Sequence, residues 1–455
     1  MEGAAADHLW RTVVLTGWGR TSTAPMPVLR PESTSRVTAT RPQGWAGVAR
    51  GLGRSYGDAS LGRDYAVDMT RLDAMLAFRD GLLSVEAGVT IGDIVRTWLP
   101  RGWLPAVTPG TQWVTVGGAI AADVHGKNQH TDGTFGCHVA DFDLLTAAGE
   151  VLHCSPTSNE RLFRASIGGM GLTGIILRAT LRLQPVGSGY FHVRYRRTAG
   201  WQDTLDWFSQ HGSEDSYNVA WIDGLAQGRA SGRAVVMAGR PLGRKEIGQS
   251  GPAYPVPPRA RRLPCNMPAG LLNRADGSLF NLLYYARHPR DHARRETWWK
   301  FFYPLDLLDN WNLLYGRRGF CQYQAVFPAE SAAPAIRSVF ATIHEAGQMA
   351  LLGVLKGMTG ATAGLLSFPR PGLTLAVDVP FRGEPTIRLF QRLYDLTADH
   401  GGRAYLAKDA LLTPRLFRRM YPEWEDFARA KAEIDPDQAW RSRLSDRVGL
   451  TGELA

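Results

Sequence analysis

Short apolar runs, in which many side chains alternate between apolar and polar, recur along the first 190 residues and predict strands. They lie at residues 46–50, 65–69, 82–88, 142–147, 150–155 and 174–183. Residues 91–99 and 159–167 instead space their apolar side chains as a helix does. Pro185, Gly187 and Gly189 interrupt this pattern, so we expect a domain boundary at residue 187. Residues 6–187 are therefore predicted to form one mixed domain of strands and helices.

A second pattern, with strands and longer helices, runs from residue 188 to residue 401. Residues 328–348 and 384–400 predict two of these helices. Residues 239–277 are rich in Pro, Gly and Arg, so we expect a mobile basic loop there. The remaining residues, 402–455, carry a charged helix.

Residues 103–122 carry no charged side chain, which is also typical of a membrane helix. Prolines and glycines break this run and its apolar residues have no helical period, so we exclude a membrane span. Glycine lets main chain approach a ligand closely, and its free N–H groups can hold phosphate. Asp123, His125 and Lys127 follow at alternate positions, which in an extended segment would place them on one face. The stretch therefore predicts a phosphate cradle followed by reactive side chains.

The charge of the chain is concentrated in one segment. The 455 residues, enough for two or three domains, have a net charge of +10. Residues 226–300 contain 14 Lys and Arg against 4 Asp and Glu, and the rest is balanced. No nucleic-acid motif accompanies the segment, so we do not expect a nucleic-acid partner. We expect an anionic membrane surface or a phosphate-bearing substrate, with a solvated face as the alternative.

The cysteines and the N-terminus exclude further classes. Cys137, Cys154, Cys265 and Cys321 form no CxxC pair, so we expect no metal site and no disulfide framework. The first residues include early acids and no apolar core, so a Sec signal peptide is not expected.

Two glycine motifs need to be distinguished. Residues 47–60, GVARGLGRSYGDAS, follow a predicted strand but do not have GxGxxG spacing, and a tight turn would explain them as well as a phosphate loop. Residues 169–174 match GxGxxG by letter. A dinucleotide fingerprint follows a strand and opens a helix, whereas here a helix precedes and a strand follows. We therefore exclude NAD binding at residues 169–174.

The glycine loop at 47–60 and the stretch at 108–138 together resemble the flavin-dependent oxidoreductases of the vanillyl-alcohol oxidase type. The similarity is greatest to the oxidase subunits of decaprenylphosphoryl-β-D-ribose 2-epimerases. It continues through DLLTAAGE (143–150), GLTGIILRATL (171–181), YGRRGFCQYQ (315–324) and YLAKD (405–409). The resemblance implies an α+β, two-domain fold of the PCMH type. It comprises an FAD-binding domain (6–187), a substrate-binding cap domain with an antiparallel sheet (188–401), and a segment (402–455) that returns to the first domain.

The resemblance also implies the residues that line the cofactor. They are Ala49, Arg50, Gly51, Leu52, Gly53, Arg54, Ser55, Tyr56, Gly57, Asp58, Ala59, Gly110, Thr115, Val116, Gly117, Gly118, Ala122, Asp123, Val124, His125, Ile176 and Tyr405. Many relatives attach FAD covalently through a histidine in the first glycine loop. Arg54 stands at that position and an arginine forms no such link, so we expect non-covalent FAD.

The resemblance further implies a catalytic group of Lys408, His125 and Tyr315. It assigns substrate binding to Lys127, Gln322, Gln324, Lys356 and Lys408. A lysine at a partly buried strand end can stabilise negative charge on a reduced flavin or act as a base. The alternatives are a surface lysine at Lys408, a structural histidine at His125, a solvated charge at Lys127 and an exposed strand face at the two glutamines.

The implied reaction is oxidation of the 2-hydroxyl of decaprenylphosphoryl-β-D-ribose, or another polyprenylphosphoryl ribose, to the 2-keto sugar. It is the first half of an epimerisation that supplies arabinose for cell-envelope arabinan, with an NAD-dependent short-chain reductase as the second subunit. We expect peripheral association with the inner membrane, on the cytoplasmic face rather than the periplasmic one. The alternatives are a soluble sugar, alditol or aldonolactone oxidase, and a non-catalytic protein that binds lipid phosphate. Ala376 replaces a pocket cysteine of mycobacterial members, so thiol-directed inhibitors are expected to fail.

Overall fold

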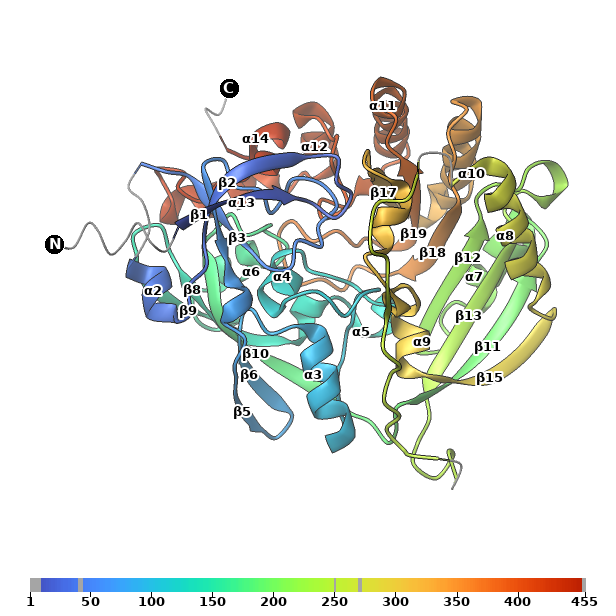
Figure 1. The fold of residues 1–455 in the computed structure, drawn as a ribbon, viewed down its shortest axis with the longest axis horizontal. Coiled ribbons are helices and arrows are strands. Elements are labelled where there is room, and N and C mark those ends of the chain that lie inside the picture. Colours follow the sequence, from blue (N-terminus) through green and yellow to red (C-terminus); the bar gives the residue numbers. More distant parts are fainter. Residues whose placement is uncertain (1–9, 40–43, 249–250, 269–271, 452–455) are drawn as a thin grey trace.

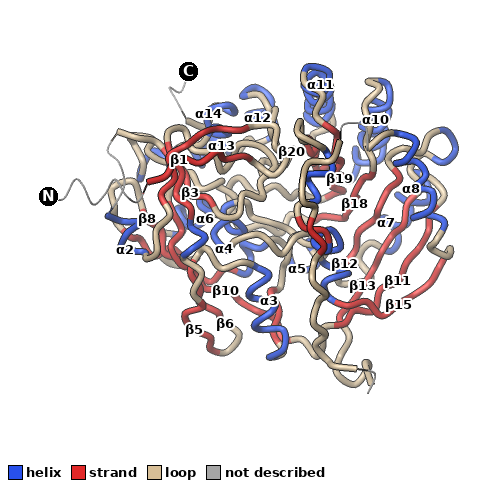
Figure 2. Tube along the Cα trace, viewed as in Figure 1, coloured by secondary structure: helices blue, strands red, loops and turns tan. Residues whose placement is uncertain are grey.

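The computed structural model describes residues 10–39, 44–248, 251–268 and 272–451. Figure 1 shows two halves, one that carries both termini and one built on a single large sheet. Figure 2 shows helices and strands in both halves, so the fold class is α+β, as expected. No helix among these residues combines the length and the apolar character that crossing a bilayer requires.

The first half contains two sheets. One has the order β1 (Trp10–Thr16), β2 (Thr23–Leu29), β4 (Tyr65–Asp68), β3 (Gly47–Arg50). The other has the order β5 (Met75–Arg79), β6 (Leu82–Glu86), β10 (Ile175–Pro185), β8 (Val139–Leu145), β9 (Val151–Cys154), and β7 (Trp103–Pro105) also pairs with β10. The helices are α2 (Thr34–Ala39), α3 (Ile91–Trp98), α4 (Val116–Ala121), α5 (Gln129–Asp132) and α6 (Glu160–Ser166).

The second half is one antiparallel sheet of eight strands. Its order is β15 (Asp291–Thr297), β11 (Tyr190–Thr198), β13 (Ala234–Pro241), β12 (Tyr217–Asp223), β18 (Leu352–Met358), β19 (Gly372–Pro380), β17 (Phe320–Pro328), β20 (Arg403–Ala404). The helices are α7 (Trp201–His211), α8 (Arg274–Ala286), α9 (Trp298–Phe302), α10 (Ala329–Glu345) and α11 (Glu384–Asp399). A separate short pair joins β14 (Arg261–Arg262) to β16 (Leu308–Asp309) in parallel.

Alternation along β17 gives this sheet two different faces. Tyr323 directs its hydroxyl to Thr397 of α11, 2.6 Å away, so one face packs on α10 and α11. Gln322 and Gln324 point to the opposite face. That opposite face lines a cavity, described below, with Lys356 of β18 and Ala376 of β19.

The C-terminal segment joins the two halves. After β20, which pairs with β17, the chain returns to the first half and forms α12 (Pro414–Met420), α13 (Trp424–Ile434) and α14 (Arg443–Val448). The N–H of Gly47 donates to the carbonyl oxygen of Ala439, and the N–H of Arg441 donates to the carbonyl oxygen of Gly47. On α14, Arg447 donates to both oxygens of Asp58 at 2.7 and 3.0 Å and to Asp409 at 2.8 Å. One guanidinium therefore ties the first glycine loop to the end of the chain.

Most of the predicted elements are present. The six predicted strands correspond to β3, β4, β6, β8, β9 and β10, and the four helices predicted with residue bounds correspond to α3, α6, α10 and α11. Residues 169–174 lie between α6 and β10, so the inverted context of this GxGxxG match is confirmed. The domain boundary at residue 187 falls between β10 and β11, which belong to different sheets. We retain the division at residues 187 and 401 as a proposal.

Two predictions differ from the structure. Residues 116–121 form the helix α4, although the apolar residues there have no helical period; Thr115 caps it by accepting the N–H of Gly118 at 3.2 Å. The expected loop at 239–277 begins inside β13, includes β14 and ends in the first turn of α8, so it is not one irregular loop. Within it, residues 249–250 and 269–271 lie outside the described residues.

Candidate active site

A cavity of about 560 Å³ lies where the two halves meet. Its walls come from the first glycine loop, the stretch around α4, the inner face of β17 to β19, residues 405–408 and the segment of β14 and β16. Most of the predicted cofactor residues line it: Ala49, Gly51, Leu52, Gly53, Arg54, Ser55, Tyr56, Ala59, Gly110, Thr115, Gly117, Gly118, Ala122, Val124, His125, Ile176 and Tyr405. The predicted substrate residues Gln322, Gln324, Lys356 and Lys408 line it as well.

Five predicted cofactor residues do not line the cavity but support its wall. Arg50 donates to Ser60 and Thr16 behind the loop, and Asp58 binds Arg447. A Cβ on Gly57 would lie 2.1 Å from the carbonyl oxygen of Asp409, so the glycine allows two loops to touch. The other two are Val116, which is buried in the core, and Asp123.

The first glycine loop presents unused donors to the cavity. Among the described residues, none of the N–H groups of Leu52, Gly53, Arg54 and Ser55 donates to another protein group. Gly53 has a φ of +61°, a left-handed conformation of the kind that turns successive N–H groups toward one point. A Cβ on Gly51 would lie 2.2 Å from Oγ1 of Thr115, so this loop and the cap of α4 touch. Such a row of donors suits an anion.

Arg54 lies in this loop and forms no ion pair with any carboxylate of the described residues. Its guanidinium stacks 4.3 Å above the ring of Trp18 and donates to the carbonyl of Leu52. Burial lowers the pKa of Arg54, against the charges of Asp306 and Asp309. The side chain therefore places a buried positive charge beside the free N–H groups.

The chain turns at Asp123, so residues 123–127 are not one extended segment and the expectation that their polar side chains share a face is wrong. Asp123 has a φ of +40°, which turns the chain. Its carboxylate accepts the N–H of Gly136 at 2.9 Å and the hydroxyl of Ser367, both away from the cavity. Lys127 points elsewhere again, and His125 alone of the three lines the cavity.

His125 is fixed between side chains of the large sheet. Its Nε2 lies 3.1 Å from Nε2 of Gln324, and its Nδ1 lies 3.2 Å from Nζ of Lys356. Phe368 stacks on the ring with centroids 5.8 Å apart. Burial, followed by the charge of Lys356, lowers the pKa of His125 well below its usual value. The imidazole is therefore neutral at pH 7.

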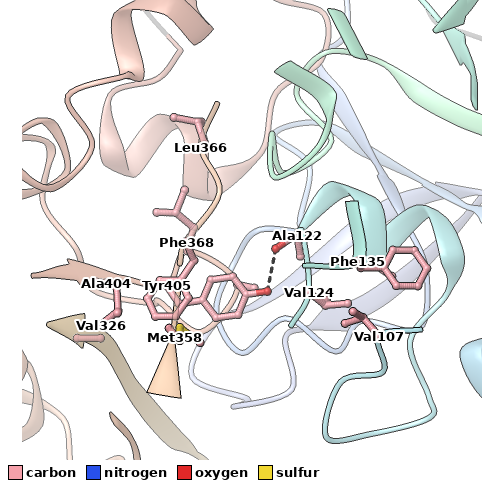
Figure 3. Packing of buried hydrophobic residues seen from close by; sticks show 14 of the residues in the cluster. Val107, Ala122, Val124, Phe135, Val326, Met358, Leu366, Phe368, Ala404 and Tyr405 are labelled. Carbon is pink, nitrogen blue, oxygen red and sulfur yellow. Dashed lines mark hydrogen bonds between the residues drawn. The ribbon is translucent and has the colours of Figure 1, made fainter. Parts of the chain in front are cut away.

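Tyr405 joins the two halves behind His125. Figure 3 shows its hydroxyl reaching across to the carbonyl oxygen of Ala122, a hydrogen bond of 2.8 Å. Its ring stacks on Phe368 with centroids 4.7 Å apart. The cavity wall at this point is thus a packed apolar cluster in which one hydrogen bond joins the two halves.

Lys408 lies in the cavity wall, where it feels the charge of Asp378, a half-buried carboxylate that the sequence interpretation missed. Its Nζ stands 3.9 Å above the ring of Tyr56. Gln322 donates to Asp378 at 2.6 Å and to the hydroxyl of Tyr56 at 3.3 Å. Burial lowers the pKa of Lys408 to about 8, and the charge of Asp378 opposes that fall. Burial likewise raises the pKa of Asp378, against the Gln322 hydrogen bond and the charge of Lys408.

A second cavity lysine also has a lowered pKa. Burial, together with the charges of Lys408 and Lys127, lowers the pKa of Lys356 to about 7. The cavity therefore contains two lysines whose pKa values burial brings close to neutral pH, next to a neutral imidazole.

Two predicted site residues lie outside the cavity lining. Lys127 is half-buried, donates to the carbonyl oxygen of Phe301 and stands 4.4 Å from the centre of that ring, and burial lowers its pKa to about 7. Tyr315 stacks on Phe320 with centroids 4.1 Å apart. Burial, followed by the charge of Asp378, raises the pKa of Tyr315 well above its usual value. Both assignments therefore stay predictions, since neither side chain is among the residues that line the cavity.

The opposite end of the cavity is formed by the short β14–β16 pair. Arg262 of β14, Asp309 of β16 and the neighbouring Asp306 line it. Asp306 accepts the N–H of Gln112 at 2.7 Å and so attaches this segment to the stretch before α4. Ala376 lines the sheet side of the cavity, and no cysteine is among the described lining residues.

Two family models match the chain. Residues 28–155 match the FAD binding domain, and residues 319–448 match the D-arabinono-1,4-lactone oxidase model. The two matches lie on the cradle side and on the sheet side of the cavity, respectively.

Individual relatives extend the similarity. Decaprenylphosphoryl-beta-D-ribose oxidase of Mycolicibacterium smegmatis is 37% identical, over 96% of this chain and 97% of its own. An uncharacterized protein of Streptomyces coelicolor is 32% identical over 80% of this chain and its own entire length. D-arabinono-1,4-lactone oxidase of Yarrowia lipolytica is 29% identical over 39% of this chain and 35% of its own.

Proposed function

Because the chain belongs to the FAD-dependent oxidoreductases of the vanillyl-alcohol oxidase type, in the family of decaprenylphosphoryl-β-D-ribose oxidase, we propose that it oxidises a lipid-linked ribose. The protein is an FAD-dependent oxidoreductase with a two-domain, PCMH-type fold. The proposed reaction converts the 2-hydroxyl of a polyprenylphosphoryl-β-D-ribose into a ketone. The observation that carries the proposal is the match to the mycobacterial oxidase over 96% of the chain.

The residues of the cavity fit FAD. The free N–H groups of residues 52–55 and the Arg54 guanidinium supply donors for a pyrophosphate. Gly110 lines the cavity with no protein atom within 4 Å of the place a Cβ would take, so the open space reaches the main chain there. When bound there, FAD would supply the hydride acceptor that removal of the carbinol hydrogen needs.

We propose that Lys408 takes the proton of the substrate hydroxyl. A proton acceptor works best when its pKa is close to the working pH, and burial lowers the pKa of Lys408 to about 8. The charge of Asp378, which accepts a hydrogen bond from Gln322 at 2.6 Å, favours the ammonium that forms. Tyr315 is less suited, because its pKa is raised and it lies outside the cavity lining.

The neighbours of Lys408 suit binding and orientation. Gln322 and Gln324 present amides to the cavity, and Lys356 presents an ammonium that suits a phosphate or a hydroxyl. His125 is neutral and held on both ring nitrogens, so we assign it to positioning Lys356 and Gln324. Lys127, which is bonded to Phe301, is proposed to support this wall rather than to contact substrate.

The rate of substrate oxidation is expected to rise with pH. Below the pKa of Lys408, about 8, the amine is protonated and accepts no proton; above that pH the rate should reach a plateau. Asp378→Asn removes the charge that favours the ammonium, so the pKa falls and the rise moves to lower pH. Stopped-flow traces at a series of pH values check this. A rise that stays in place in Asp378→Asn would contradict the assignment.

The flavin is expected to leave the protein on denaturation. Arg54 occupies the loop position at which relatives carry the attaching histidine, and its guanidinium is stacked on Trp18. Acid precipitation should therefore give a colourless pellet and a yellow supernatant. Colour retained in the pellet would show a covalent bond and contradict the proposal.

The other partners follow from the proposed reaction. A keto sugar that is to be epimerised requires a separate NAD-dependent short-chain reductase, and a lipid-linked substrate requires peripheral contact with the inner membrane. We propose the cytoplasmic face. The basic segment 226–300 supports contact with an anionic surface.

A soluble sugar, alditol or aldonolactone oxidase is the second candidate. The lactone oxidase model favours it, but its match covers only residues 319–448. Incubation with polyprenylphosphoryl ribose and an artificial electron acceptor tests the two. The proposal expects a product lighter by one pair of hydrogen atoms, with no turnover of free ribose or aldonolactones; turnover of the free compounds alone would favour the second candidate.

A further inference from the structure

Helix α8 presents a row of large apolar side chains to solvent. Leu279, Phe280, Leu282 and Leu283 are 57%, 54%, 48% and 61% exposed. Twelve large hydrophobic side chains are exposed among the described residues, and four of them lie within residues 279–283. Single exposed hydrophobics are ordinary, whereas a contiguous group marks an interaction site.

The inner side of the same helix carries the polar anchors. Asn281 is buried and donates to Asp223 at 2.7 Å and to the carbonyl of Leu351 at 2.6 Å. Tyr285 donates to the carbonyl of Thr198 at 2.9 Å. A surface helix normally buries its apolar stripe and exposes its polar one. In α8 this order is reversed, so the apolar face is available to something other than the core.

Arginines flank the apolar face. Arg274 opens the helix, Arg287 and Arg290 follow its end, and Arg294 lies on the edge strand β15 with its guanidinium 5.6 Å from the centre of the Tyr195 ring; all four are exposed. None of the four forms an ion pair with any described residue. Figure 1 shows α8 (yellow-green) at the outer side of the large sheet, beyond β12 and β13. A rim of unpaired positive charge around an apolar face is typical of a helix that lies in a membrane interface.

We infer that α8 docks the protein on the surface of an anionic lipid bilayer. Its leucines and phenylalanine enter the boundary between headgroups and acyl chains, and the arginines bind lipid phosphates. A second copy fits this face less well, because a two-fold contact through α8 would bring the arginine rims against each other. The inference rests on the proposed function in one respect, since a membrane-dissolved substrate explains why a docking face is needed.

Vesicle flotation of the FAD-loaded full chain tests the inference without any substrate. The protein should float with vesicles of phosphatidylcholine and phosphatidylglycerol, and much less with phosphatidylcholine alone. Phe280→Ser with Leu283→Ser should lower the partition coefficient about tenfold or more, since it removes two inserted side chains. Leu76→Ser with Val151→Ser, at two positions that are 48% and 47% exposed in the other half, should leave binding unchanged.

Three results would overturn the inference. The first is a wild-type protein that does not float with the vesicles. The second is an α8 variant that floats as well as the wild type. The third is wild-type protein that binds equally to both vesicle compositions. A wild-type dimer in sedimentation velocity that the α8 variant converts to a monomer would assign the face to a second copy instead. The oxidation of a short-chain, water-soluble analogue should be unchanged in the α8 variant. Failure of docking and failure of the proposed reaction are therefore seen in different measurements.

Discussion

Replacing Lys408 with methionine is expected to slow substrate oxidation by a factor of about 10² to 10⁴, the usual contribution of a positioned proton acceptor. Methionine keeps the bulk of the side chain but accepts no proton and carries no charge. Asp378 would then lose the positive charge that opposes the effect of burial, so its pKa would rise further. Stopped-flow measurement of flavin reduction at saturating substrate checks the rate directly.

Lys408→Arg separates the two roles of the lysine. Arginine keeps the positive charge but remains protonated, so it serves as a cation and not as a base. If Lys408 moves a proton, the arginine variant should be nearly as slow as the methionine variant. Lys300→Met, at an exposed lysine of α9, is the matched control and should react as the wild type does. Full activity in Lys408→Arg would contradict the role of proton acceptor.

Replacing Arg447 with methionine is expected to lower the free energy of unfolding by about 3–5 kcal/mol, because it leaves buried carboxylates without their counter-charge. The side chain of Asp409 is fully buried and that of Asp58 is 10% exposed. Asp409 also accepts the hydroxyl of Tyr394 and follows Lys408 directly. The loss should therefore appear in stability first and in the position of Lys408 second.

Urea unfolding followed by circular dichroism measures this change. Arg443→Met is the control on the same helix, since among the described residues Arg443 has no ion pair, and it should change the unfolding free energy by less than about 1 kcal/mol. Equal losses of unfolding free energy in the two variants would contradict the role given to the charge network. The stability of this region would then depend on apolar packing, for example of Phe417 and Leu412, which are both fully buried.

Much of the fold could be predicted because its local signals agree. The strands of the first half alternate in pattern, and α3 begins at a Thr90–Asp93 capping box that the periodicity of residues 91–99 follows. β2 was missed because Pro25 and Pro27 remove two N–H donors from a strand that nevertheless pairs on both sides. The α4 helix was missed because it is short and rich in glycine, and its stability comes from the Thr115 cap and its surroundings.

The site was predicted in part, for a different reason. Resemblance located residues that the fold then brings together over long separations: Gln324 and His125 are 199 residues apart, and Lys356 and His125 are 231 apart. Asp378 gave no signal, because one acid in an apolar strand does not reveal that a lysine will face it. Lys127 was assigned to the substrate by resemblance, whereas the alternation of residues 123, 125 and 127 had suggested a shared face that the structure does not form. The left-handed turn at Asp123 depends on contacts with Gly136 and Ser367, which no local pattern contains.

An anaerobic absorbance titration of the purified protein with polyprenylphosphoryl ribose, with free ribose as the control, tests the central claim most directly. The account predicts that the lipid-linked sugar bleaches the flavin band and that free ribose does not. Bleaching by free sugars or lactones alone would contradict the substrate class. A bound flavin that no sugar reduces would leave the family assignment in place and contradict the proposed reaction.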